Sequence, residues 1–376
     1  MNTRRTRLRS AIAVILTVLV LAPTAVLFGR VWRDNSDQRD STALEKKGVQ
    51  YIVALAPLIS ALVEAQSSAL QGVSAPPASL KVAIAQVSAV DADLGAALRT
   101  KARWAGLQDK ISKLSKVTGG APAVYQANVE VTDLALALYD AVRRNSELNR
   151  DPDNDLANLE QAVAVDMPTT VVLVSRMGDL ANLLAAANVK TRPELAVEFG
   201  QEVIAAQDSV STLTDDLQAA VDDTKSPTLS GILVSTLDSF RRGVESTTRG
   251  ANPGAAPNAA TIAIAQSSLK TAMSSLATVT LKEMTKLLDD RISTLNYRRD
   301  EAAAMGLLAV ALTLGVVIFS RGGRRRETPA PVAPQSGETG RGDVVPRTGG
   351  YGAQHDRRPS FGNVTPTRQE RSGVLR

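Results

Sequence analysis

The sequence predicts an all-α protein: an elongated extracytoplasmic helical bundle between two transmembrane helices, followed by a disordered C-terminal tail. Three observations support this fold class. Only 3% of the 376 residues are aromatic while 44% are hydrophobic, a composition that suits helices better than strands when Ala, Val and Leu dominate it. No stretch alternates apolar and polar residues as a strand does, whereas apolar residues recur at helical spacing. Two long uncharged runs enclose this helical region.

The two uncharged runs, residues 10–29 and 302–320, are predicted to be transmembrane helices. At about 1.5 Å of rise per residue, each would span roughly 30 Å, which is the thickness of the hydrocarbon core of a bilayer. Basic residues flank the two runs on their outer sides in the sequence, namely Arg4, Arg5, Arg7 and Arg9 before the first, and Arg321, Arg324, Arg325 and Arg326 after the second. The positive-inside rule then predicts a two-pass protein of the plasma membrane with both termini, 1–9 and 321–376, in the cytoplasm and residues 30–301 outside.

A cleaved signal peptide is the alternative for the first run. The segment Ala22-Pro23-Thr24-Ala25 loosely resembles a cleavage site with small residues. The apolar run continues through Phe28, however, and the helical pattern runs straight on from it. An uncleaved membrane anchor is therefore the favoured interpretation.

Charge and composition argue against several classes of function. The net charge of +5 comes from the two ends, because residues 1–30 carry +5 and residues 321–376 carry +6, which leaves −6 on the outer segment. The basic balance therefore indicates no nucleic-acid partner. The chain has no Cys and a single His, His355 in the tail, and it contains no phosphate-binding loop, nucleophile elbow or metal-ligand spacing. We expect no enzyme activity, no cofactor and no metal.

The outer segment divides into helices at clusters of Pro, Gly and Asp. A seam of period 3.5 begins the region and predicts packing of one helical stripe against neighbouring helices; its residues are Leu44, Gly48, Tyr51, Leu55, Leu58 and Leu62. The breaks predict seven helical segments, at about 30–72, 78–118, 122–148, 154–189, 193–224, 227–249 and 258–321. Two stacked helical modules that share the long first and last helices are the preferred arrangement, and one elongated bundle is the alternative.

Two motifs resemble a known group of helical bundles. The first is the segment from Glu45 through Gly48 and Tyr51 to Pro57 in the leucine seam; the second begins at Ser146, continues through an acidic turn to a later proline, and consists of Ser146, Asp151, Pro152, Asp153, Asp155 and Pro168. Together they resemble the extracytoplasmic sensor regions of bacterial chemoreceptors, sensor histidine kinases and diguanylate cyclases, over residues 40–190. The resemblance implies a helical sensing domain, a small-molecule ligand outside the cell and a homodimer formed through the first helix.

The residues themselves leave the roles of these positions open. Tyr51 lies on the seam, so core packing is favoured over contact with a ligand. Asp151, Asp153 and Asp155 are favoured as helix-capping residues over a cation site, because Pro152 and the lack of a following Gly and Glu spoil a calcium loop. Relatives often carry a His-Arg-Gly step where this chain has Gln66, Ser67 and Ser68, so the resemblance supports the fold more than a retained ligand site.

The tail and the outer domain together suggest two functions. Residues 322–376 contain ten Gly and six Pro without apolar periodicity, which predicts disorder, and the cluster at 324–326 would attract anionic lipid headgroups or simply stop transfer. Members of the group usually carry an output domain after the second span, which this tail does not resemble. The favoured function is a membrane receptor-like protein that relays a signal through its tail to a separate cytoplasmic signalling protein. A structural or scaffold protein of the cell envelope is the alternative.

Overall fold

The computed structural model describes residues 2–73, 75–148, 154–223, 227–251 and 258–322. Their helices are α1 (Asn2–Leu70), α2 (Ala78–Leu94), α3 (Lys101–Lys113), the 3₁₀ turn η1 (Leu114–Lys116), α4 (Ala121–Asn145), α5 (Asn154–Gln161), the π-helical turn η2 (Ala162–Asp166), α6 (Met167–Ala186), α7 (Arg192–Asp223), α8 (Pro227–Ala251) and α9 (Ala259–Gly322). Within these described ranges there is no strand. The predicted all-α fold class is therefore confirmed.

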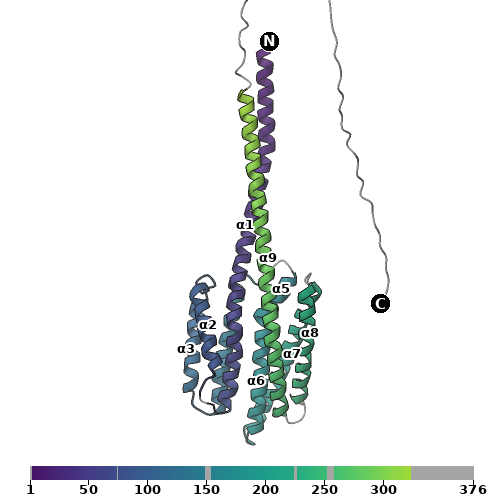
Figure 1. The fold of residues 1–376 in the computed structure, drawn as a ribbon. Coiled ribbons are helices and arrows are strands. Elements are labelled where there is room, and N and C mark those ends of the chain that lie inside the picture. Colours follow the sequence, from purple (N-terminus) through teal and green to yellow (C-terminus); the bar gives the residue numbers. More distant parts are fainter. Residues whose placement is uncertain (1, 74, 149–153, 224–226, 252–257, 323–376) are drawn as a thin grey trace, which may run out of the picture. The chain divides into compact units, whose positions relative to one another are not determined.

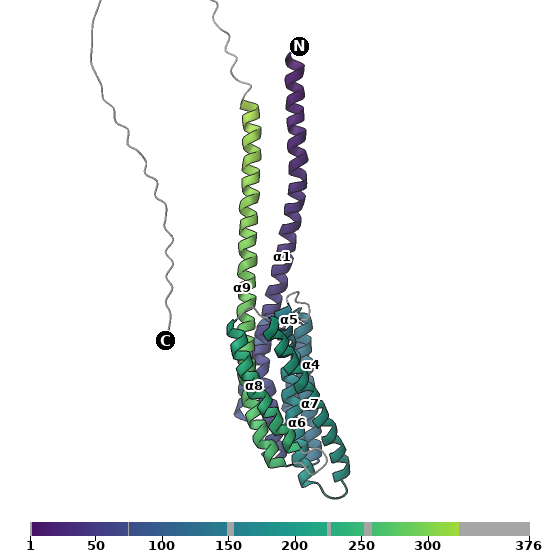
Figure 2. The same ribbon diagram turned by 90° about the vertical axis from the view of Figure 1, so that its right-hand side faces the viewer.

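Residues 1–317 form one compact unit, and the chain from Ile318 onward belongs to a second. In the first unit the helices lie beside one another and neighbours along the chain run in opposite directions, except for α5 and α6, which η2 joins into one segment (Figures 1 and 2). Helices α1 and α9 are much longer than the others and extend beyond them from the same end (Figure 2). We call this the emergent end of the bundle. The two stacked modules expected from the sequence are not confirmed, and the predicted tail from Gly323 lies outside the described residues.

The core follows the leucine seam of α1. Tyr51, Leu55 and Leu58 have no exposed surface, and Leu62 has 1%. On α9 the equivalent stripe is buried at Leu281, Met284, Leu288 and Leu295. The α1 stripe packs against α2, α4 and α6, and Leu281, Met284 and Leu288 of α9 belong to the same continuous cluster of buried apolar side chains. Burial of this cluster supplies most of the driving force for such a bundle.

One predicted helix, 78–118, proved wrong because the structure divides it into α2, α3 and η1. The break lies at residues 95–100, where Arg99 adopts a positive φ of 53°. The buried carboxylate of Asp91 holds this turn, since it accepts hydrogen bonds from Thr100 Oγ1 at 2.6 Å and from the Tyr51 hydroxyl at 2.8 Å. Hydrogen bonds between side chains hold the turn where the helix is interrupted. The sequence has no Pro and no pair of Gly residues here that would have predicted the break.

The predicted segment 154–189 is helical but not uniform. It begins as α5, widens into the π-helical turn η2 and continues as α6 to Ala186. Pro168, the second residue of α6, has no N–H to donate to the preceding turn. A wider π turn immediately before it accommodates the lost hydrogen bond, and such turns are frequent at functional sites.

The two predicted transmembrane helices, 10–29 and 302–320, are not confirmed, because the described residues contain one candidate membrane-spanning helix, near the N-terminus. Of the described residues, Leu21–Leu70 of α1 is the stretch that is long and apolar enough to cross a membrane, a test that the buried core helix of a soluble protein also passes. Large apolar side chains are exposed on α1 beyond the bundle, with Val26 69% and Leu27 62% exposed. On α9, Leu307 is 72% exposed and Leu312 63% exposed.

Candidate functional site

The two motifs meet in space at the emergent end. Gly48 of α1 lies against the end of α4, where a Cβ on it would stand 2.2 Å from Ser146 Oγ and 2.9 Å from Leu148 Cδ1. Ser146 is fully buried and donates its hydroxyl to the Val142 carbonyl at 2.7 Å. The glycine is therefore required by the close approach of the two helices. The first and second motifs form one contact, although almost a hundred residues separate them.

The same contact continues into a polar junction between α4, α1 and α9. Glu147 follows Ser146 in the left-handed region, with φ at 64°, and its Oε2 accepts a hydrogen bond from Ser41 Oγ at 2.6 Å. One turn further along α1, the carboxylate of Glu45 pairs with Arg291 of α9 at 3.6 Å. We call the set Ser41, Glu45, Gly48, Ser146, Glu147 and Arg291 the junction.

The ion pair between Glu45 and Arg291 is largely buried. The side chain of Glu45 is 4% exposed and that of Arg291 is 22% exposed, so solvent screens this pair less than it screens an ion pair on the surface. Two further contacts tie α1 to α9 nearby. Lys46 Nζ lies 2.5 Å from Asp289 Oδ1, and Asn35 Nδ2 donates to the Leu295 carbonyl at 3.1 Å.

Tyr51 lies inside the core. It has no exposed surface, and its hydroxyl donates to Asp91. Burial raises the pKa of the Tyr51 hydroxyl, Thr100 opposes this and Asp91 adds to it, so the group stays protonated and remains a donor. Its surroundings are those of a packing residue with a satisfied hydroxyl.

A second polar centre lies deeper, between α1 and α6. Asp179 of α6, 4% exposed, accepts hydrogen bonds from Gln66 Nε2 and Ser67 Oγ of α1, both at 2.8 Å. Burial raises the pKa of the Asp179 carboxyl to about 6, although these two donors lower it. Gln66 and Ser67 occupy the positions at which similar sensor regions often carry His and Arg. In this chain they bind a carboxylate of the same domain.

A third feature is a buried acid beside the π turn. Asp166 ends η2 and is 5% exposed, and its Oδ1 accepts a hydrogen bond from Gln161 Nε2 at 3.2 Å. Burial and the neighbouring Asp216 of α7 raise the pKa of the Asp166 carboxyl to about 7, against the lowering effects of Gln161 and of Arg143. The Asp166 carboxyl is therefore partly protonated near neutral pH.

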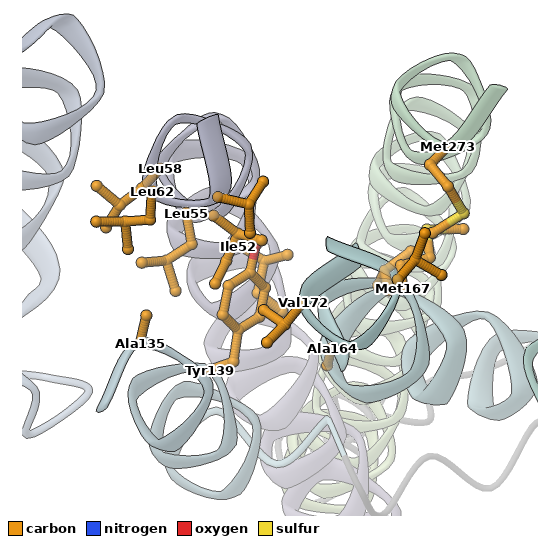
Figure 3. Close-up of a cluster of buried hydrophobic side chains, with 14 of the residues drawn as sticks. Ile52, Leu55, Leu58, Leu62, Ala135, Tyr139, Ala164, Met167, Val172 and Met273 are labelled. Atoms are coloured by element: carbon orange, nitrogen blue, oxygen red, sulfur yellow. The ribbon is translucent and has the colours of Figure 1, made fainter. Parts of the chain in front are cut away.

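The two prolines of the motifs line one cleft. Pro57 of α1 and Pro168 of α6 both contribute to a cavity of about 710 Å³ that opens between α1, α2, α6 and α9. Figure 3 shows part of its walls, with Ile52 on α1 opposite Met167 of α6 and Met273 of α9. The cleft thus lies directly between the two long helices.

The side chains of the remaining predicted positions lie outside the part of the chain that the structure describes. Asp155 belongs to α5, and Arg4, Arg5, Arg7, Arg9 and Arg321 belong to α1 or α9. Asp151, Pro152, Asp153, Arg324, Arg325 and Arg326 lie outside the described residues. In the part of the chain that the structure describes, no three acidic or His side chains are grouped so that they could hold a metal ion.

Sequence reasoning missed the partners of the motifs. Glu147, Asp179 and Arg291 look like ordinary helical surface residues, since nothing in their local sequence indicates burial. Asp166 carried a weak signal, because it is an acid within the apolar run Ala162–Met167 just before a proline. An acid in an apolar stripe is a reason to look for a buried partner.

Comparisons with protein-family models, curated proteins and solved structures find no match to this chain. The class of protein is therefore defined by the structure alone. It is a helical bundle whose first and last helices emerge together, with a polar junction where they leave it.

Proposed function

We propose that the protein is an integral membrane receptor-like protein, with both termini in the cytoplasm and a helical outer domain that relays a change to a separate cytoplasmic partner. The single observation that carries the proposal is the junction. The end of α4 contacts α1 through Ser146 and Glu147, and one turn away α1 contacts α9 through Glu45 and Arg291. A shift of α4 against α1 therefore acts on the pair of helices that leaves the bundle.

The physical basis of the relay is the stiffness of packed helices. Packed interfaces switch between discrete arrangements rather than deforming continuously. An α-helix passes a small translation or rotation along its axis, and α1 is one helix from Asn2 to Leu70. The exposed apolar residues on both α1 and α9 beyond the bundle support their insertion into lipid.

The topology can be tested by labelling single cysteines, because the chain has none of its own. Ser239 is an exposed residue of α8, and Ser360 lies in the tail. A membrane-impermeant maleimide should label S239C in intact cells and S360C only after permeabilisation. Labelling of S360C in intact cells, or protection of S239C, would overturn the two-pass topology.

The relay can be tested by measuring the separation of α1 and α9 in the full chain in nanodiscs. Nitroxide labels at R33C and R298C, both exposed positions next to the bundle, would report it through pulsed dipolar spectroscopy. The variant R291M breaks the junction and should shift the distance distribution. D109N, which alters an exposed ion pair on α3, is the matched control. An unchanged distribution in R291M would argue that the junction does not control the helix pair.

A scaffold of the cell envelope is the second candidate. One observation favours it: Gln66 and Ser67, at positions where the resemblance suggests ligand contact, are already occupied by Asp179. Deleting residues 323–376 separates the two functions. A scaffold should keep its localisation and its cellular phenotype without the tail, whereas a relay protein should keep only its localisation.

A further inference from the structure

The cleft between α1 and α9 has the size and chemistry of a ligand site. Its volume of about 710 Å³ falls in the usual range of small-molecule pockets, roughly 300–1,000 Å³. Its lining is mainly apolar, with Val53 and Pro57 on α1, Ala277 on α9 and Met167 and Val171 from α6. Apolar surface of this kind favours a hydrocarbon portion of a ligand.

The apolar wall of the cleft includes one phenol side chain, that of Tyr139. Tyr139 of α4 is 2% exposed, lines the cleft and projects toward Ile52 of α1 (Figure 3). Within the described part of the chain its hydroxyl makes no hydrogen bond, in contrast to Tyr51, whose hydroxyl donates to Asp91. Burial raises the pKa of the Tyr139 hydroxyl, so it stays protonated. Because Tyr139 lines the cleft, an oxygen atom of a ligand bound there could accept a hydrogen bond from its hydroxyl.

The rim of the cleft is positively charged. Glu64 of α1 pairs with Lys270 of α9 across it at 3.8 Å and also accepts a hydrogen bond from Ser79 of α2 at 3.0 Å. Lys282, further along α9, also lines the cleft and is exposed. Two lysines against one glutamate leave a net positive rim, which attracts an anionic group.

We propose that this cleft binds an oxygenated fatty acid: a hydrocarbon chain on the apolar floor, a carboxylate at the lysine rim and a hydroxyl or keto oxygen that accepts the hydrogen bond of Tyr139. This inference deepens the proposed function, on which its role in sensing rests, because such a ligand would lie between the two helices that leave the bundle. The binding itself does not require the relay.

Binding is measured on the full chain in nanodiscs with three probes: dodecanoate, ω-hydroxydodecanoate and dodecylamine. Each probe is titrated by competition against radiolabelled dodecanoate and by the shift of the thermal midpoint, which rises with the concentration of a ligand that binds the native state. The two carboxylates should bind and compete, the hydroxylated one more tightly, and the amine should do neither. Equal binding of the amine would overturn the proposal.

Three variants locate the site. K282A should weaken both carboxylates by about fivefold, the upper range for an exposed ion pair, and A277W should abolish binding by filling the cleft. Y139F should remove the preference for the hydroxylated probe while keeping affinity for dodecanoate. K286A is the control, since Lys286 lies one turn along α9 from Lys282 and does not line the cleft. Equal affinity in K282A, A277W and K286A would place the probes in the lipid and overturn the proposal.

A second copy of the chain is the competing occupant of the cleft. Light scattering measures the molar mass of the protein. If that mass halves in A277W and the carboxylates have no effect on it, a second copy fills the cleft, which contradicts the ligand site. The probes could fail to bind while the labelling confirms the two-pass topology and R291M still shifts the distance distribution. This outcome would overturn the ligand site and leave the proposed function standing. Binding of the carboxylates together with a reversed topology would support the ligand site and overturn the proposed function.

Discussion

Gly48 of α1 and Ser146 of α4 leave no room between them for a methyl group, because a Cβ on Gly48 would stand 2.2 Å from Ser146 Oγ. The helices at the emergent end are therefore closer than side chains normally permit. This contact fixes the position of the acidic Glu147, which follows it and bonds to Ser41.

The substitution G48A should destabilise the fold by about 1–3 kcal/mol, since the methyl group forces α4 away from α1. Unfolding in urea, followed by circular dichroism, measures the change. G106A is the matched control: Gly106 lies within α3 with nothing inside 4 Å of its Cβ position, and it should stabilise by about 0.5–1 kcal/mol. Similar effects of the two substitutions would contradict the close approach.

The pair of Glu45 and Arg291 should show a coupling energy of about 1–3 kcal/mol in a double-mutant cycle with E45Q and R291M, because both side chains are largely buried. The exposed pair Lys113 and Asp109, with both side chains more than half exposed, should give about 0.3–0.5 kcal/mol. Adding salt should reduce the second coupling more than the first. A coupling below that of the exposed pair would mean that the junction holds no specific ion pair.

Stability should fall as the pH rises from about 4 to about 7. The pKa of Asp166 is raised to about 7 by burial and Asp216, and that of Asp179 to about 6 by burial, whereas an unfolded Asp titrates near 3.9. Between these values the folded state binds more protons than the unfolded state, so the free energy of unfolding decreases with rising pH. The gain is complete below about pH 4 and lost above about pH 7.

Urea unfolding at a series of pH values tests this dependence. D179N should remove the part of the slope that ends near pH 6, and D166N the part that extends to about pH 7, where Gln161, Arg143 and Asp216 surround the carboxyl. A slope of the same size in D166N and in the unmodified chain would contradict the raised pKa of Asp166.

Removal of the Asp91 carboxylate should cost more than removal of either donor to it. D91A leaves the buried Tyr51 hydroxyl without an acceptor and releases the turn at residues 95–100, for an expected loss of about 2–4 kcal/mol. Y51F keeps the bond from Thr100 to Asp91 and should cost about 1 kcal/mol. Thermal unfolding of both variants ranks them. A larger loss of stability in Y51F than in D91A would contradict the role of the Asp91 carboxylate in holding the turn.

The periodic features of the sequence predicted most of the fold. The seam through Leu55, Leu58 and Leu62 lies in the core as expected, because the spacing of apolar residues depends only on helix geometry. The break between α2 and α3 could not be predicted, since it depends on Asp91 meeting Thr100 and Tyr51, one of which is forty residues away. Contacts of this kind follow from tertiary structure, which local propensity does not encode.

The candidate site was predicted in part. The resemblance picked out Glu45, Gly48 and Ser146, and the structure brings these residues to one place. Arg291 and Glu147, which complete the junction, carry no local signal because charged residues on helices are usually solvated. The opposite holds for Gln66 and Ser67, which looked like a lost ligand contact and hold Asp179 instead.

Pro57 lines the cleft and still lies within one unbroken helix, which continues past Leu21 at the other end. At about 1.5 Å per residue, roughly 50 Å of continuous rod separates these two positions. This rod contains Pro23 as well as Pro57, and each proline removes one backbone hydrogen bond of the helix. Helices bend most readily at prolines, so in the proposed relay a displacement at the cleft would reach the far end of α1 partly as bending at Pro23. In the proposed relay, the sensitivity of the protein would then depend on how rigidly α1 and α9 are held together at the junction and on the stiffness of α1 around Pro23.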